Sequence, residues 1–121
     1  MFHKKRVWCV SPVGSAEELA EKITQHSWTL CTGFQIDGYL FLNDATSEDG
    51  AQEYAVVKCP ANPGEPYRQV ESLTMSWCTQ EKALESIRRT LAGEFDEAGC
   101  AASVEPKLET PAVHGHCHLC R

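Results

Sequence analysis

The segment WTLCTGFQIDGYLFLND, residues 28–44, constrains the fold of this chain more than any other part of the sequence. Its first half alternates large apolar residues with smaller or polar ones, which is the pattern of a strand with one buried face. Asp37 and Gly38 then form a two-residue loop that tolerates positive φ at both positions, as a tight hairpin requires. Apolar cross-strand pairs hold such a hairpin in register. Counting outward from the loop gives two of them: Ile36 with Tyr39, and Phe34 with Phe41.

Three further segments have the alternation or the β-branched content of strands. They are residues 5–11, 53–58 and 67–78. The segment PANPGEP between the last two holds three prolines and one glycine, which predicts a surface loop.

Two segments have the apolar periodicity and the end signals of helices. Ser15 is followed three residues later by Glu18, which is the spacing of a capping box. In the second helix, Thr79 is the expected N-cap and Gly93 the expected left-handed end. The order strand–helix–strand–strand–strand–strand–helix predicts an α+β fold: a mostly antiparallel sheet of about five strands with two helices on one face. The first two strands are joined through a helix, so that pair is compatible with parallel pairing.

The sequence changes character after the second helix. Only a few residues beyond position 93 are large and apolar, and Pro106 and Pro111 interrupt any regular element. We therefore predict one globular domain over residues 1–93 and a flexible, irregular tail over residues 94–121.

Composition excludes several classes of function. The net charge of −6 over 121 residues argues against binding to nucleic acid through the phosphate backbone. No apolar run approaches the roughly 18 residues needed to cross a bilayer, so no membrane association is expected. An odd number of cysteines, seven, with no recognisable secretory signal predicts a cytoplasmic protein whose cysteines are packed thiols or metal ligands rather than a disulfide framework.

The end of the chain, HGHCHLCR, raises the question of a metal site. Thiolate and imidazole ligands suit zinc, and four of them complete a tetrahedral site. The candidate ligands are His114, His116, Cys117, His118 and Cys120. The competing interpretation is an exposed terminus that binds metal only opportunistically, because standard zinc modules have two separated ligand pairs.

Thiol chemistry is the alternative to a binding function. Cys117 and Cys120 have the C-x-x-C spacing of redox motifs, although no strand-to-helix context precedes them. Cys31 with His26 is a second candidate pair, as nucleophile and base. Free cysteines are more often simply buried, and no other catalytic motif is present, so an enzyme is the less favoured hypothesis.

The second face of the predicted sheet gives the leading functional hypothesis. Leu40 and Leu42 point away from the face that the two helices cover, so we expect them to form an exposed apolar binding surface. Such a surface suits a protein partner or a second copy of the chain as a dimer. The sequence therefore predicts a small non-enzymatic protein-interaction module with a zinc-binding tail.

Overall fold

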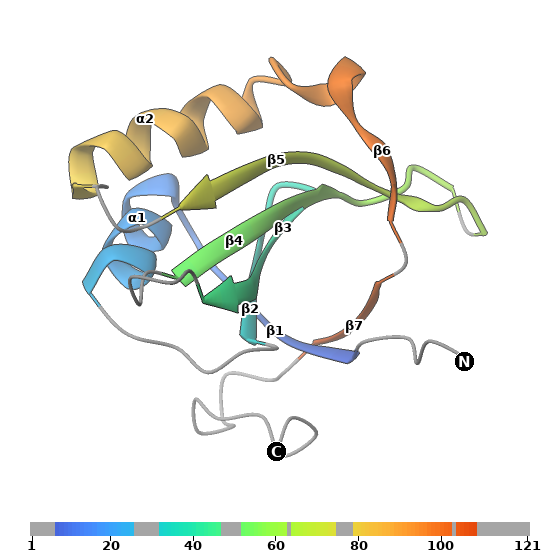
Figure 1. Cartoon of the computed structure of the whole chain (residues 1–121), viewed down its shortest axis with the longest axis horizontal. Helices are drawn as coiled ribbons and strands as arrows, with labels where there is room; N and C mark the ends of the chain where they lie inside the picture. The colour runs from blue at the N-terminus through green and yellow to red at the C-terminus, as the bar shows by residue number, and fades with distance from the viewer. Residues whose placement is uncertain are drawn as a thin grey trace.

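The computed structural model of the chain describes residues 7–25, 32–46, 52–62, 64–74, 79–102 and 104–108. Within these residues it contains two α-helices, one short 3₁₀-helix and one seven-stranded sheet (Figure 1). The strands are β1 (Val7–Pro12), β2 (Thr32–Ile36), β3 (Tyr39–Thr46), β4 (Gln52–Lys58), β5 (Tyr67–Thr74), β6 (Cys100–Ala102) and β7 (Glu105–Leu108). The helices are α1 (Ala16–Gln25), α2 (Gln80–Leu91) and η1 (Asp96–Ala98). The predicted α+β class and the order of the first seven elements are confirmed.

The local signals that were read from the sequence account for these elements. Asp37 and Gly38 have φ angles of 47° and 82°, and the predicted cross-strand pairs of the hairpin are present. β1 and β2 pair in parallel, and β2, β3, β4 and β5 pair antiparallel in chain order. The hydroxyl of Thr79 accepts a hydrogen bond from the Lys82 amide, and α2 is followed by Gly93 at a φ of 85°. Neither helix in the described part of the chain has the length and apolarity that crossing a bilayer requires.

The sheet is strongly curled, because its last two strands lie at opposite edges. The strand order is β6-β5-β4-β3-β2-β1-β7, yet only two residues separate β6 from β7 in the sequence. A step of three residues spans at most about 11 Å, whereas the edges of a flat sheet of this size lie about 29 Å apart. The connection therefore draws the two edges together. Figure 1 shows β6 running from β5 toward β7, which lies beside β1.

Two apolar clusters form, one on each face of this sheet. The outer cluster lies under α1 and α2 and includes Leu19, Ile23, Phe41, Tyr54, Val56 and Ile87. The inner cluster lies on the opposite face and consists of Trp8, Val10, Leu40, Leu42 and Val57. Val104, from the connection between β6 and β7, packs against the inner cluster. The curled sheet and its closing segment thus cover the face that the helices leave open.

This closure corrects the expectation about Leu40 and Leu42. Each side chain is only 1% exposed, as part of the inner cluster. They do not form a binding surface in this structure, because the sheet curls around them.

The closure also corrects the expected boundary at residue 93. Residues 94–108 contribute η1, β6 and β7 to the fold. Pro106 lies in β7 at the edge of the sheet and pairs with Trp8 of β1. Proline is tolerated in an edge strand, because an amide donor is not needed on the open side. The rest of the predicted tail, residues 109–121, lies outside the described residues.

Gly33 is closely packed against its neighbours in the sheet, which gives a first prediction. A Cβ atom there would lie 2.7 Å from Leu42 Cδ2 and 3.3 Å from Val10 Cγ2. We expect Gly33→Ala to lower the free energy of unfolding by about 1–2 kcal/mol, because the buried neighbours must shift. Denaturant unfolding measures this, with Gly14→Ala as the control, since its Cβ would have 3.5 Å to the nearest atom. Equal stability of both variants would contradict the packing described here.

Candidate functional site

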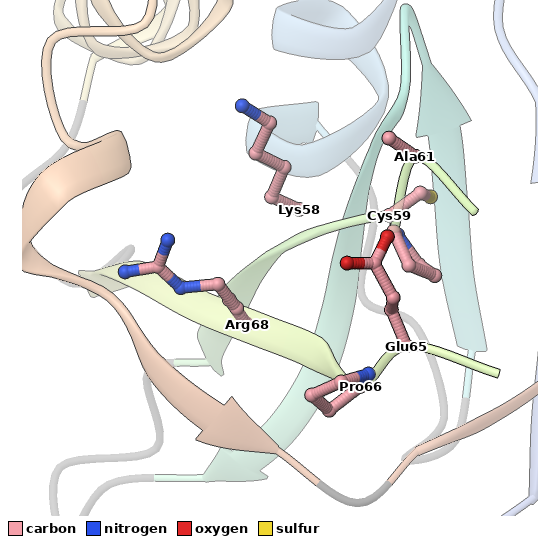
Figure 2. Close-up of a pocket in the computed structure, with 7 residues that line it drawn as sticks. Lys58, Cys59, Ala61, Glu65, Pro66 and Arg68 are labelled. Atoms are coloured by element: carbon pink, nitrogen blue, oxygen red, sulfur yellow. The ribbon is translucent and has the colours of Figure 1, made fainter.

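Two hollows adjoin at the end of the sheet where β4 turns into β5, and they share Glu65 and Pro66 as a common wall. The first has a volume of about 300 Å³ and is otherwise lined by Lys58, Cys59, Pro60, Ala61 and Arg68 (Figure 2). The second has a volume of about 530 Å³ and is otherwise lined by Gly64, Tyr67, Ala101, Ala102 and Val104. We call these walls together the rim.

Hydrogen bonds from the neighbouring elements hold the rim in place. The Cys59 amide donates to the Gly38 carbonyl over 2.8 Å, which ties the start of the connection to the β2–β3 hairpin. The Asn62 amide and side chain both donate to Glu65 Oε1 over 3.0 Å, which closes a turn inside the connection. β6 forms the opposite wall because it pairs with the beginning of β5.

Cys59 is the thiol of the rim. It is free and partly buried, and it packs against the inner cluster. Burial raises the pKa of the Cys59 thiol above its ordinary value. Burial also raises the pKa of the Tyr67 hydroxyl, with a further contribution from the charge of Cys59. A reactive cysteine needs the opposite change, a lowered pKa, so this shift disfavours Cys59 as a nucleophile.

A charged cluster fixes the side of the rim that faces η1. Asp96 accepts hydrogen bonds from Tyr39 Oη over 2.8 Å and from Lys58 Nζ over 2.6 Å. Arg68 Nη2 donates to the Gly99 carbonyl over 3.0 Å, just after η1. Figure 2 shows Lys58 and Arg68 extending to the same side of the hollow, away from Cys59 and Ala61. These contacts anchor η1, and with it the start of β6, against β3, β4 and β5.

The cluster shifts the pKa values of its own members. Burial alone raises the pKa of Asp96, but the hydrogen bonds from Lys58 and Tyr39 more than offset it and hold that pKa below the ordinary value. Burial, followed by the bond to Asp96, raises the pKa of Tyr39 to about 12. An acid with a lowered folded-state pKa stabilises the fold above its unfolded-state pKa, and this stabilisation is lost as the pH falls through the folded-state value. A raised tyrosine pKa stabilises the fold below about pH 10, and this is lost as the pH rises toward about 12.

Asp96→Asn tests this cluster. We expect the free energy of unfolding near pH 7 to fall by about 1–2 kcal/mol, because two hydrogen bonds lose their charged acceptor. The loss should shrink at strongly acidic pH, where Asp96 is protonated in both states, and the tyrosine absorbance titration should show the Tyr39 pKa moving down toward 10. Glu97→Gln is the matched control, since Glu97 is an exposed carboxylate of the same short helix. An equal effect of both substitutions would contradict the assigned contacts.

The cysteines depart from the expectation that all of them are thiols or metal ligands. Cys9 is disulfide-bonded, whereas Cys59 and Cys100 are free. The partner of Cys9 is therefore a cysteine outside the described residues. Disulfides persist mainly in oxidising compartments, so this bond weighs against the cytoplasmic location, which stays a prediction.

The other predicted site residues lie outside the described part of the chain. This applies to the five proposed zinc ligands, His114, His116, Cys117, His118 and Cys120, and also to the proposed pair Cys31 and His26. Among the residues that the structure does describe, no three histidine, cysteine or acidic side chains gather in a way that would hold a metal ion. The sequence did mark the rim as a loop through its prolines, but nothing in the sequence placed β6 against it.

Comparisons with protein-family models, with curated proteins and with solved structures found no match for this chain. The functional argument therefore starts from the chemistry of the rim.

Proposed function

We propose that this chain is a non-enzymatic protein-interaction domain that binds an extended segment of a partner protein at the rim. The observation that carries the proposal is the pair of adjoining hollows on either side of Glu65 and Pro66. Alternate side chains of an extended segment lie on one face, about 7 Å apart. Two neighbouring hollows suit two such side chains, with the shared wall between them.

The chemistry of the walls supports a protein ligand. Proline, alanine and valine side chains provide apolar contacts in both hollows. Arg68 is exposed, and its guanidinium carries five N–H donors, of which the contact with Gly99 uses one. Such a mixture of apolar wall and fixed polar donor is usual at protein interfaces. The raised pKa of Cys59 favours binding over thiol catalysis at this place.

Site-directed cross-linking followed by affinity measurement tests the proposal. A photoreactive residue in place of Glu65 should capture a partner that the same residue in place of Glu81, exposed on α2, does not capture. The captured protein is then purified, and its Kd is measured by calorimetry. Ala101→Trp fills the second hollow and should weaken binding about tenfold or more, whereas Ala92→Trp, at an exposed alanine away from the rim, should leave the Kd unchanged.

Three results would overturn the proposal. One is equal capture of the partner by the photoreactive residue at positions 65 and 81. Another is a Kd that changes with Ala92→Trp and not with Ala101→Trp. The third is capture of a second copy of this chain from position 65, which would make the rim a self-association surface instead.

The zinc-binding tail stays a proposal alongside this one, and it rests on the spacing of Cys117, Cys120 and the three histidines. Under reducing conditions, the intact chain should bind one zinc ion tightly, and a chain ending at Val113 should not. Equal binding by the two chains, or weak binding by both, would remove the tail as a zinc site. Binding at the rim is independent of this result.

A further inference from the structure

One side of the first hollow of the rim carries an excess of positive charge. Lys58 and Arg68 both line this hollow and extend to the same side of it (Figure 2). Lys58 Nζ lies 2.6 Å from Asp96 Oδ2, so these two charges are paired. Arg68 forms no ion pair within the described part of the chain, and its hydrogen bond goes to the uncharged Gly99 carbonyl. Two cations and one carboxylate leave the charge of Arg68 in excess.

The second carboxylate of the rim makes a different contact. Glu65 Oε1 accepts hydrogen bonds from the amide and from the side chain of Asn62, both over 3.0 Å. Glu65 and Arg68 both line the first hollow, but they form no ion pair with each other. A carboxylate that enters this hollow is therefore attracted on the Arg68 side and repelled at the wall that contains Glu65. These two charges together define where the carboxylate sits.

The Arg68 guanidinium is positioned by its contact with the chain after η1. Its Nη2 donates to the Gly99 carbonyl over 3.0 Å. A Cβ atom at Gly99 would lie 3.4 Å from Arg68 Nε, so glycine at this position leaves room for the guanidinium. The contact uses one of the five N–H donors of the guanidinium. The planar group still matches the two oxygens of a carboxylate, and its fixed position lowers the entropy that binding costs.

The second hollow has a different chemistry. It is the larger of the two, with a volume of about 530 Å³, and Tyr67, Ala101, Ala102 and Val104 form most of its walls. These walls are mainly apolar, and the two alanine side chains leave space, so the hollow suits a large apolar side chain. Side chains on one face of an extended segment are about 7 Å apart, which is the spacing of every second residue. One segment can therefore place a carboxylate in the first hollow and an apolar group in the second.

This inference rests on the proposed function and names its ligand. We propose that the extended segment bound at the rim is acidic: an aspartate or glutamate pairs with Arg68, and a large apolar side chain two positions away fills the second hollow. Charge complementarity carries the choice of this partner. The net charge of −6 means that the chain as a whole does not attract an acidic segment, so the attraction comes from this local positive charge. The preference for an acidic residue should therefore depend on Arg68.

Selection of random octapeptides displayed on phage tests the proposal. Peptides enriched on the unaltered chain should carry an acidic residue two positions from a large apolar one. Ala101→Trp should abolish the enrichment, whereas Arg68→Gln should keep the apolar preference and lose the acidic one. Arg88→Gln is the matched control and should keep both preferences, because Arg88 is an exposed arginine of α2 that pairs with Glu17.

A synthetic copy of an enriched peptide gives the quantitative measurement. Replacing its acidic residue by the corresponding amide should raise the Kd for the unaltered chain about fivefold or more, and should leave the Kd for Arg68→Gln unchanged. The first of these comparisons uses no variant of the chain, so it does not depend on how well a variant folds.

The outcomes separate this inference from the proposed function. Enrichment that Ala101→Trp abolishes, but with no acidic preference or with one that Arg68→Gln retains, would overturn the acidic ligand and leave binding at the rim in place. Peptides that bind Ala101→Trp as well as the unaltered chain, or a selection that enriches no peptide, would overturn both.

Discussion

A chain that ends at Gly93 is expected to lose most of its stability, although the sequence alone places the end of the domain there. Such a chain lacks η1, β6 and β7, so the inner cluster loses the segment that covers it. Burying one large apolar side chain contributes about 1.5–3 kcal/mol. Exposure of parts of Trp8, Val10 and their neighbours should therefore remove about 4 kcal/mol or more. Domains of this size have only about 5–15 kcal/mol in total.

The matched control is a chain that ends at Leu108, which keeps every described element. With both chains reduced, its free energy of unfolding should equal that of the intact chain within about 0.5 kcal/mol. Denaturant unfolding followed by tryptophan fluorescence measures both, because Trp8, one of the three tryptophans of the chain, lies in the inner cluster. Equal stability of all three chains would mean that residues 94–108 are a dispensable tail, as the sequence pattern suggested.

Loss of the disulfide at Cys9 should have the second largest effect. Cys9 lies in β1, where it pairs with Thr32 of β2 on one side and with Lys107 of β7 on the other. Cross-links of this kind typically contribute about 2–4 kcal/mol, and we expect Cys9→Ala to lower the free energy of unfolding by that amount. Reduction of the unaltered chain should have the same effect. Cys100→Ala, at an exposed free thiol, should have none.

Peptide mapping under non-reducing conditions identifies the partner of Cys9. The candidates are the four cysteines outside the described residues, Cys31, Cys78, Cys117 and Cys120. A pairing with Cys117 or Cys120 would remove a proposed zinc ligand. A Cys9 thiol that is alkylated in the unreduced, unfolded chain would show that no disulfide is present.

The part of the fold that sequence reasoning predicted correctly rests on local signals. The hairpin follows from a two-residue turn that needs positive φ and from the apolar pairs that flank it. The helices follow from hydroxyl caps and from a glycine that ends α2. Each of these signals lies within a few residues of the structure that it determines, so no tertiary information is needed.

The part that was predicted wrongly depends on contacts between distant segments. β6 has the sequence Cys-Ala-Ala, with no alternation, and β7 contains Pro106. These segments form strands because they complete two edges of a sheet that is already in place. That closure buries Leu40 and Leu42, which an open sheet would have exposed. The alternation of apolar and polar residues within one strand does not show whether a distant segment will cover the apolar face of that strand.

The amino-acid composition predicted the loop of the rim, but the sequence did not predict which other residues would lie beside that loop. Three prolines and a glycine predicted a surface loop between β4 and β5, and the structure has one. Its functional interest comes from Arg68, Ala101 and Val104, which belong to the flanking strands and to the closing connection. Only the closure of the sheet brings these residues to one place.

Amide hydrogen exchange of β6 and β7 tests the central claim, that these strands close the sheet and build the rim. The account predicts that every second amide of β6 and β7, those directed at β5 and β1, exchanges slowly, at rates close to those of the paired amides in β1 and β5. Exchange at the rate of an unstructured peptide throughout residues 100–108 would contradict it, and would leave both the closed inner cluster and the rim without support.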